Sequence, residues 1–361
     1  MERKKEIQET IIKPANNTQK ATDEEFLNIL KLIAPGTHLR TALDSALRAK
    51  KGALIVVENE NIISLLDGGF RINTKFTPQK LVELVKMDGA IILSKDMKKI
   101  NYANVLLTPS SKTKTSETGT RHKAAERTAK EAETFVIAIS ERKNEITLFY
   151  KNLRYPVMPT EELLRSANER MQILEKQREL FDSYIEKLNF MELRNMINLK
   201  QATNVIQRGM LIQKITENLN KYIIELGKSG VLLRVRLKEL IKGIEKETDL
   251  VMKDYSQLNM KRSKILLQDL SYDEIIDNER IMEILGYGDL IPQSISVKGW
   301  RMLSKTCLED SEIANLIREA GSLGKAMNSR PDFYKNILGE ERGKSFQEEI
   351  RRIKLSNLMN N

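Results

Sequence analysis

Proline spacing is the feature that most restricts how this chain can fold. Six of the eight prolines lie before residue 160, and the other two are Pro292 and Pro331. The stretch from Thr160 to Ile291 therefore contains none. Because proline inside a helix removes a backbone hydrogen bond and clashes with the preceding turn, only this stretch can form long uninterrupted helices. The spacing predicts three domains, comprising residues 1–155, 156–285 and 286–361.

The first part of the chain predicts an α/β domain with a mixed central sheet flanked by helices. Short apolar runs rich in β-branched residues alternate there with helical patterns, which is typical of central strands covered on both faces. Thr77-Pro78 predicts a helix start, since proline is favoured at the first helical position. The predicted strands are residues 53–57, 90–94, 103–107, 135–140 and 146–150.

The other two parts predict all-α domains. Apolar residues recur at three-, four- and seven-residue steps from Leu164 to Leu188, so they share one face of a helix. We expect a long helical hairpin or small bundle, whose simplest role is that of a spacer. Predicted helix ends are Gly209, Gly227 and Gly230. Predicted short helices in the third part are residues 294–304, 310–320, 322–327 and 340–353.

Composition and charge narrow the functional classes. Cys307 is the sole cysteine, which excludes an internal disulfide and a cysteine-rich metal site, and we interpret it as a small core residue in a reducing cytoplasm. No apolar run approaches the ~20 residues of a membrane span, and the first residues lack a signal-peptide core. We therefore expect a cytoplasmic protein without a membrane partner. The net charge of +10 favours anionic partners, nucleic acid first among them.

A candidate phosphate site begins at Gly119-Thr120, which offers backbone N–H donors and space for close approach. Arg121-His122-Lys123 adds cationic or titratable side chains. Residues 124–131 predict a helix, whose N-terminal dipole would favour anions. The alternative is a solvated basic turn, which short motifs of this kind often are. The Ser/Thr/Lys-rich loop 110–116, which we expect to be mobile, favours a ligand site.

A second candidate is Asp88, between a predicted helix at 81–87 and an apolar strand. A carboxylate here can bind Mg²⁺ or Mn²⁺ and orient a hydroxyl for attack. Gly89 has no side chain to obstruct a base or ribose against the backbone. The alternative is an ordinary Asp-Gly turn.

Asp88-Gly89-Ala90, the run 119–127 and the strand 135–141 together resemble the diadenylate cyclase family, in its full-length form with a helical spine and a C-terminal helix-hairpin-helix region. The resemblance implies condensation of two ATP molecules into cyclic di-AMP with release of two pyrophosphates, assisted by Mg²⁺ or Mn²⁺. Since the product is two-fold symmetric and one domain holds one ATP, two cyclase domains must face each other. The resemblance implies a homo-oligomer, an octamer, and an inactive monomer.

The resemblance also implies roles for individual residues. Asp88 would bind the metal and activate the ribose 3′-hydroxyl. Position 123 is arginine in the family, and Lys123 keeps the charge but loses the bidentate fork. The implied ATP-binding residues are Gly89 and Leu107 at the adenosine, Thr120, Arg121, His122 and Lys123 at the phosphates, and Ala124 and Ser140 nearby.

Cations in the third part predict contacts with DNA phosphates. Residues 337–344 resemble a helix-hairpin-helix turn, whose backbone N–H groups and cations bind DNA without base readout. Asn336 replaces the first glycine of that pattern, and asparagine tolerates the left-handed backbone. For the cations near residue 300 the alternative is a solvated helical face. Predicted DNA contacts are Lys298, Arg301, Lys305, Gly339 and Lys344, and the resemblance implies branched DNA such as Holliday junctions.

Two functions therefore remain open. The first is a DNA-linked diadenylate cyclase, in which DNA bound at one end changes cyclase output through the helical spine. The second is a non-enzymatic DNA-binding scaffold whose first domain only binds nucleotide. Product formation from ATP with either metal distinguishes them.

Overall fold

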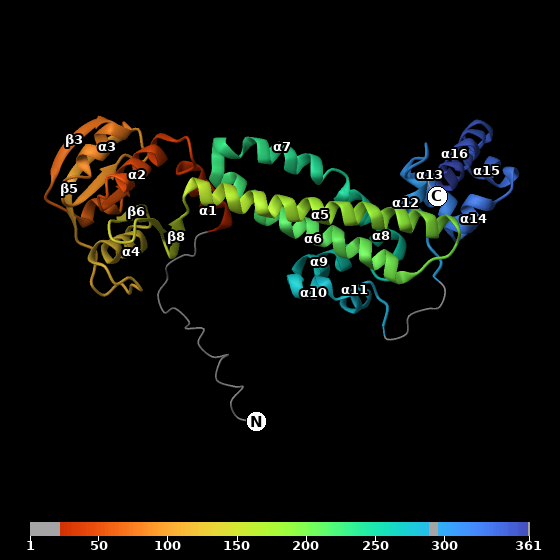
Figure 1. The fold of residues 1–361 in the computed structure, drawn as a ribbon. Coiled ribbons are helices and arrows are strands. Elements are labelled where there is room, and N and C mark those ends of the chain that lie inside the picture. The colour runs from red at the N-terminus through yellow and green to blue at the C-terminus, as the bar shows by residue number, and fades with distance from the viewer. Residues whose placement is uncertain (1–21, 289–294, 360–361) are drawn as a thin grey trace, which may run out of the picture. The chain divides into compact units, whose positions relative to one another are not determined.

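The computed structural model describes residues 22–288 and 295–359, which form two compact units. The first unit comprises the described residues up to Leu164 together with Ile224–Gly230, and the second comprises Arg165–Ile223 and the residues from Val231 onward (Figure 1). The N-terminal residues and Ser294, where a helix was predicted to begin, lie outside the described residues. The division into three domains stays a prediction.

The first unit contains the predicted mixed sheet, with eight strands in the order β2-β5-β4-β1-β6-β7-β8 and β3 also paired with β5. Strand β1 (Ala53–Val57) runs parallel to β4 (Ala90–Leu93) and antiparallel to β6 (Phe135–Ser140). The other strands are β2 (Leu66–Asp67), β3 (Phe70–Lys75), β5 (Lys99–Leu107), β7 (Glu145–Tyr150) and β8 (Leu153–Val157).

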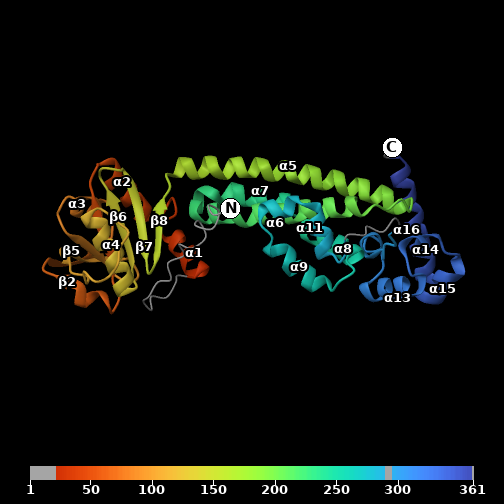
Figure 2. The ribbon, with the colours of Figure 1, turned by 90° about the horizontal axis from the view of Figure 1, so that it is seen from below.

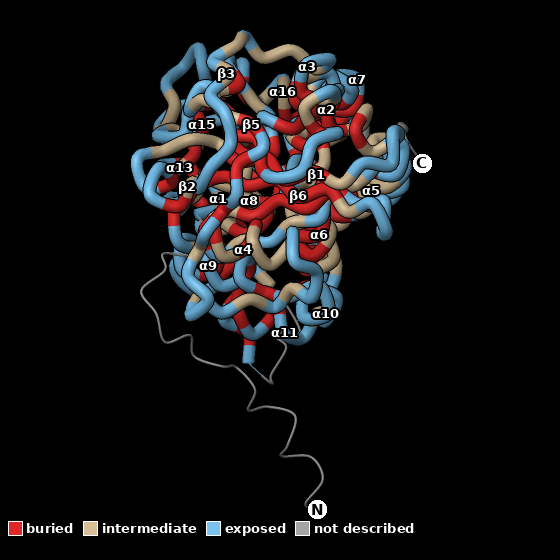
Figure 3. The backbone as a smooth tube through the Cα atoms, turned by 90° about the vertical axis from the view of Figure 1, so that its left-hand side faces the viewer, coloured by how far each residue is buried: buried red, intermediate tan, exposed pale blue. Residues whose placement is uncertain are grey.

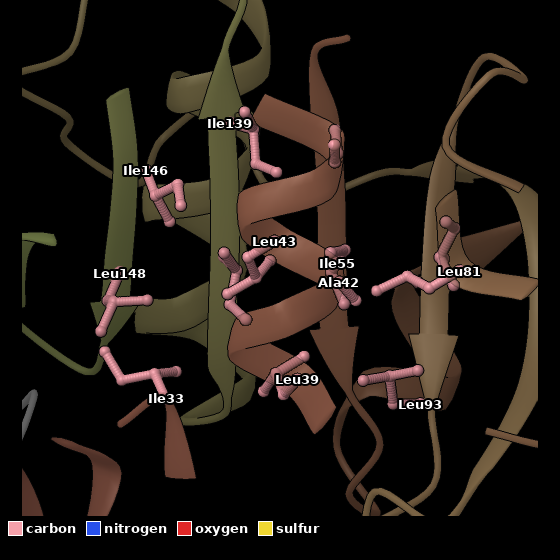
Figure 4. Close-up of a cluster of buried hydrophobic side chains, with 14 of the residues drawn as sticks. Ile33, Leu39, Ala42, Leu43, Ile55, Leu81, Leu93, Ile139, Ile146 and Leu148 are labelled. Atoms are coloured by element: carbon pink, nitrogen blue, oxygen red, sulfur yellow. The ribbon is translucent and has the colours of Figure 1, made fainter. Parts of the chain in front are cut away.

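Helices cover both faces of this sheet. Because successive side chains of a strand point to opposite faces, Ile55 packs toward α1 (Asp23–Leu32), α2 (His38–Arg48) and α3 (Pro78–Leu84), and Val56 packs toward α4 (Thr120–Ala132). Figure 4 shows Leu39 and Leu43 of α2 against the sheet residues. In Figure 3 the central strands β1 and β6 are buried, as their apolar sequences predict.

The sequence pattern missed the short or half-exposed strands. Strands β3 and β8 alternate between exposed and half-buried residues and carry no continuous apolar run. The predicted start of α3 is confirmed, because the Thr77 side chain accepts a hydrogen bond from the Lys80 N–H and Pro78 occupies the first turn. This helix ends at Leu84, earlier than the predicted Met87, so a turn separates it from Asp88.

The second unit is helical, as predicted. Helices α5 (Thr160–Leu193) and α6 (Leu199–Leu226) run side by side in Figures 1 and 2, and Arg208 Nη1 donates to Gln177 Oε1 at 2.8 Å. The predicted apolar face of α5 is buried at Ala167, Met171, Leu174, Phe181 and Leu188.

One predicted helix end is wrong. Gly209 lies inside α6, where a Cβ atom would come within 2.1 Å of Thr248 Oγ1 on α8 (Ile244–Tyr255). Glycine at this position therefore lets two helices pack closely. Gly227 does end α6, with φ at +53°.

The C-terminal helices match the prediction in part. Of the described residues in the predicted helix 294–304, only Trp300–Leu303 are helical, and they form α12.

Cys307 is exposed, so its interpretation as a core residue is wrong. None of the described helices is long and apolar enough to cross a membrane. The remaining helices are α7 (Val231–Leu240), α9 (Met260–Asp269), α10 (Tyr272–Ile276), α11 (Asn278–Ile284), α13 (Asp310–Ala320), α14 (Leu323–Asn328), α15 (Pro331–Leu338) and α16 (Glu340–Met359).

Candidate nucleotide site

Strand register gathers the predicted site residues at one edge of the sheet. Ile55 of β1 pairs with Ile91 of β4, so the residues preceding β1 and β4 lie next to each other. Ala53 pairs with Ile139, which places Ser140 beside the same edge. Ala90 pairs with Val105, so the end of β5 at Leu107 also lies there. Long-range strand pairing thus brings together residues that are far apart in sequence.

The turn before β4 presents Asp88 to solvent. Gly89 has φ at +83°, and a Cβ atom there would lie 2.8 Å from the carbonyl carbon of Asn104. Only glycine fits both the positive φ and this close approach to β5. Asp88 is exposed, and among the described residues its carboxylate has no hydrogen-bond or ion-pair partner. It is therefore available to a metal or a hydroxyl.

Helix α4 begins at the same edge. It starts at Thr120, earlier than the predicted residue 124, with Gly119 as its N-cap and no acidic residue in its first turn. Arg121-His122-Lys123 therefore lies within the first turn. The N–H groups of Thr120, Arg121 and His122 precede the first hydrogen bond of the helix, which the Lys123 N–H donates to the Gly119 carbonyl at 2.8 Å. The opposite end of α4 is fixed far from this edge, because Asn59 Nδ2 donates to the carbonyl of Ala132 at 2.6 Å.

Sequence analysis missed Gly52, which precedes β1. An ideal Cβ at Gly52 would lie 2.0 Å from Arg121 Nη1 and 2.7 Å from Arg121 Cζ. The Arg121 guanidinium therefore rests directly on this glycine. The only sequence signal was a glycine next to a buried strand, which indicates close approach of another group.

His122 does not supply a third positive charge. It is half-buried, and its ring lies 6.3 Å from the Phe149 ring in an edge-on arrangement. Burial lowers the pKa of His122 below its usual value, with the Arg121 charge acting in the same direction and Glu117 opposing it. At neutral pH the imidazole is neutral and can donate one hydrogen bond and accept another. The charge of the triplet comes from Arg121 and Lys123.

The residues present fit a divalent metal bound jointly with substrate. No group of three or more His, Cys, Asp or Glu side chains among the described residues could hold a metal by itself. Mg²⁺ is commonly bound by one or two carboxylates together with substrate phosphates. Asp88 can supply that carboxylate, and the first turn of α4 can hold the phosphates.

The predicted DNA contacts separate into different environments. Arg301 is fully buried, with ion pairs to Glu192 at 2.5 Å and Glu247 at 3.0 Å, so its prediction as a DNA contact is wrong. Lys298 and Lys305 are exposed. Lys298 Nζ donates to the Ser256 carbonyl at 3.0 Å.

The predicted hairpin turn is a one-residue connection between two helices, called the Gly339 corner below. Gly339, with φ at +83°, joins α15 to α16, and Lys344 is exposed on the first turns of α16. Sequence analysis missed Gly343, where a Cβ atom would lie 3.2 Å from the Tyr334 carbonyl oxygen. Because Gly343 has no side chain, α15 and α16 pack together there. The rings of Tyr334 on α15 and Phe346 on α16 lie with their centroids 5.4 Å apart.

Two family models and several curated proteins match this chain. Residues 40–153 match the family model described as DisA bacterial checkpoint controller nucleotide-binding, and residues 157–293 match the model of the DisA linker region. The DNA integrity scanning protein DisA of Clostridium acetobutylicum is 38% identical over 347 residues, covering 94% of this chain and 97% of the relative. The protein of the same name from Acetivibrio thermocellus is 38% identical over 341 residues, covering 92% and 95%.

The chain belongs to the DisA family. The candidate site lies inside the DisA nucleotide-binding region, which confirms the resemblance of this part to a nucleotide-binding domain. The buried Arg301 and the corner at Gly339 lie beyond both matched DisA regions.

Proposed function

We propose that the protein is a cytoplasmic diadenylate cyclase that condenses two ATP molecules into cyclic di-AMP and two pyrophosphates. The observation that carries this proposal is the single sheet edge shared by the Asp88 carboxylate and the first turn of α4. In the reaction, each 3′-oxygen attacks the α-phosphorus of the other ATP. In each attack a bond forms between the 3′-oxygen and the α-phosphorus, and the bond from that phosphorus to pyrophosphate breaks. The pyrophosphate and the hydroxyl proton are released to solvent.

The residues of this chain act mainly by positioning and charge neutralisation, which dominate phosphoryl transfer. A bound Mg²⁺ or Mn²⁺ would neutralise phosphate charge and lower the pKa of the attacking hydroxyl. Asp88 holds that metal and orients the 3′-hydroxyl. Arg121, Lys123 and the first N–H groups of α4 bind the phosphate oxygens, while neutral His122 donates a hydrogen bond.

The exposed edge also supports a paired site. Asp88, Gly89 and Thr120 are all exposed in the single chain, so a second cyclase domain can approach them face to face. We propose a homo-oligomer, an octamer as the family resemblance implies, and expect a monomer to be inactive.

Incubating the purified protein with ATP and either Mg²⁺ or Mn²⁺ tests the enzyme proposal. We expect cyclic di-AMP and pyrophosphate in a 1:2 ratio by the stoichiometry of the condensation. ATP binding without product under both metals would instead support the nucleotide-binding scaffold.

Gly52→Ala is expected to lower turnover by roughly ten- to a hundredfold, because the new Cβ displaces the Arg121 guanidinium. Since the displaced group is the flexible end of a side chain, the free energy of unfolding should change by only about 0.5 kcal/mol. Steady-state kinetics and thermal denaturation measure the two effects. The matched control is Gly288→Ala, where an added Cβ meets nothing within 4 Å. Wild-type turnover in Gly52→Ala would remove Arg121 from the phosphate site.

We further propose that the C-terminal helices bind branched DNA through exposed cations near the Gly339 corner, and that this binding changes cyclase output. Lys344→Glu is expected to weaken binding to a four-way junction and to reduce the magnitude of the salt-dependence slope by about 1. Fluorescence anisotropy with labelled junctions measures both. The control is Lys176→Glu, at an equally exposed lysine on α5. Equal losses of affinity in both variants would refute the assignment of Lys344 to the DNA site.

Equal product formation with and without the junction would refute the proposal that DNA binding changes cyclase output.

A further inference from the structure

The loop between β5 and α4 connects the two ends of the candidate site. It leaves β5 after Leu107 and enters α4 at Thr120. The Ser/Thr/Lys composition of residues 110–116 predicted a mobile segment. The structure instead ties it to the flank of α4 by a series of hydrogen bonds.

Arg127 and Lys130 hold the backbone carbonyls of this loop. Arg127 Nε donates to the Thr113 carbonyl at 3.0 Å, and Nη2 of the same side chain donates to the Ser111 carbonyl at 3.2 Å. Lys130 Nζ donates to the Lys114 carbonyl at 2.9 Å. Three loop carbonyls thus accept hydrogen bonds from cations of one helix.

Glu126 holds the following residues from the same helix. It is 7% exposed, and its Oε2 accepts from the Thr115 hydroxyl and from the Ser116 N–H at 3.1 Å. Its Oε1 accepts from Lys130 Nζ at 2.7 Å. Burial would raise the pKa of Glu126, but the hydrogen bonds from Lys130 and Thr115 outweigh it and hold the pKa below its usual value. The carboxylate is therefore ionised, and charge-assisted bonds of this kind are roughly twice as strong as neutral ones.

A second anchor follows immediately. Glu117 forms an ion pair with Arg154 on β8, and its charge also acts on His122. Two residues later, Gly119 forms the N-cap of α4, which begins at Thr120. These contacts, made further along α4 and on β8, set the direction in which the chain enters residues Gly119–Lys123. We call these residues the phosphate turn.

We infer that Glu126 and Arg127 are positioning residues that fix the loop before ATP arrives, so that the phosphate turn is already formed. The inference rests on the proposed nucleotide function of this edge. The carboxylate and guanidinium are occupied by the loop, so they act on ATP through Gly119–Lys123 and not by contact. An ordered phosphate turn avoids the entropy of ordering at the moment of binding, and thereby raises affinity.

Two variants of the full-length protein test the inference, Glu126→Gln and Arg127→Ala. We expect trypsin cleavage after Lys112 and Lys114 to accelerate by about tenfold, the factor expected for losing one such bond. The KM for ATP, and the Kd for ATP measured by calorimetry, should rise by a similar factor, with kcat changed much less. The control is Glu133→Gln. Glu133 is exposed at the C-terminal cap of α4 and forms no hydrogen bond or ion pair with the loop among the described residues, so this variant should leave all of these at wild-type values.

The cleavage assay and the calorimetry do not depend on turnover, so they separate this inference from the cyclase proposal. A wild-type protein that binds ATP but makes no product would refute the cyclase while leaving the loop test intact. Unchanged cleavage in both variants would overturn the inference. Faster cleavage with unchanged KM and Kd would also overturn it, because the loop would then be held without effect on ATP.

Discussion

Replacing Asp88 by asparagine is expected to reduce cyclic di-AMP formation by about 10²–10⁴-fold while leaving ATP affinity within a few-fold of wild type. The amide has the same shape but carries no charge, so it cannot serve as an anionic metal ligand or assist loss of the 3′-hydroxyl proton. The turn should survive, because Gly89 determines its conformation and the exposed Asp88 side chain has no hydrogen-bond or ion-pair partner among the described residues. Product formation and calorimetric ATP binding measure the two quantities separately.

Asp96→Asn is the matched control for that experiment. Asp96 lies beyond the opposite end of β4, where it accepts hydrogen bonds from the Ser94 hydroxyl and the Lys98 N–H. The same chemical change at that end should leave turnover near wild type. Lys123→Arg, which keeps the charge and introduces the residue that the family resemblance implies, should also stay active. Equal losses from Asp88→Asn and Asp96→Asn would remove Asp88 from its catalytic role.

Arg301→Met is expected to destabilise the second unit by about 3–5 kcal/mol, the usual cost of breaking a buried ion pair from one side. The Arg301 side chain and the Glu192 side chain are both 0% exposed. Nη1 of the arginine also donates to Asn189 Oδ1 at 2.6 Å. Without the guanidinium, a buried carboxylate loses its compensating charge.

The surroundings of Arg301 make the cost larger than that of a surface pair. Asp254 accepts the backbone N–H groups of Gly299, Trp300 and Arg301 at 2.7–2.9 Å. Burial raises the pKa of Asp254 to about 6, so at neutral pH it remains largely ionised near Glu192. Tyr255 also donates its hydroxyl hydrogen bond to Glu192 at 2.9 Å. The arginine is the cation that balances this group of carboxylates.

Trp300, the sole tryptophan in the sequence, adjoins Arg301, so its fluorescence during urea unfolding measures the stability of this region. Lys305→Met is the control: Lys305 pairs with Glu247 at 3.3 Å but its side chain is 39% exposed, and its loss should cost less than about 1 kcal/mol. Replacing Glu192 by methionine as well should recover stability in the Arg301→Met background. Similar effects of Arg301→Met and Lys305→Met would contradict the buried-pair explanation.

Local sequence signals predicted the strands that have continuous apolar runs and the helix start that has a capping residue. Continuous apolar runs identified β1, β4 and β6, because strands covered on both faces need apolar residues at every position. The half-exposed strand β3 lacked that signal, as did β8, which contains Pro156. Thr77-Pro78 identified the start of α3, because capping is decided within one helical turn.

The sequence by itself determined the family, the α/β and helical parts, and the candidates Asp88 and Arg121-His122-Lys123, since each depends on neighbouring residues. Only the tertiary structure decided which residues meet. It placed Gly52 under Arg121 and tied the predicted mobile loop to Glu126 and Arg127. It also buried Arg301 against Glu192, 109 residues away. The physical reason is that burial and charge pairing depend on packing between distant segments, and no local pattern distinguishes a cation that reaches solvent from one that neutralises a buried carboxylate.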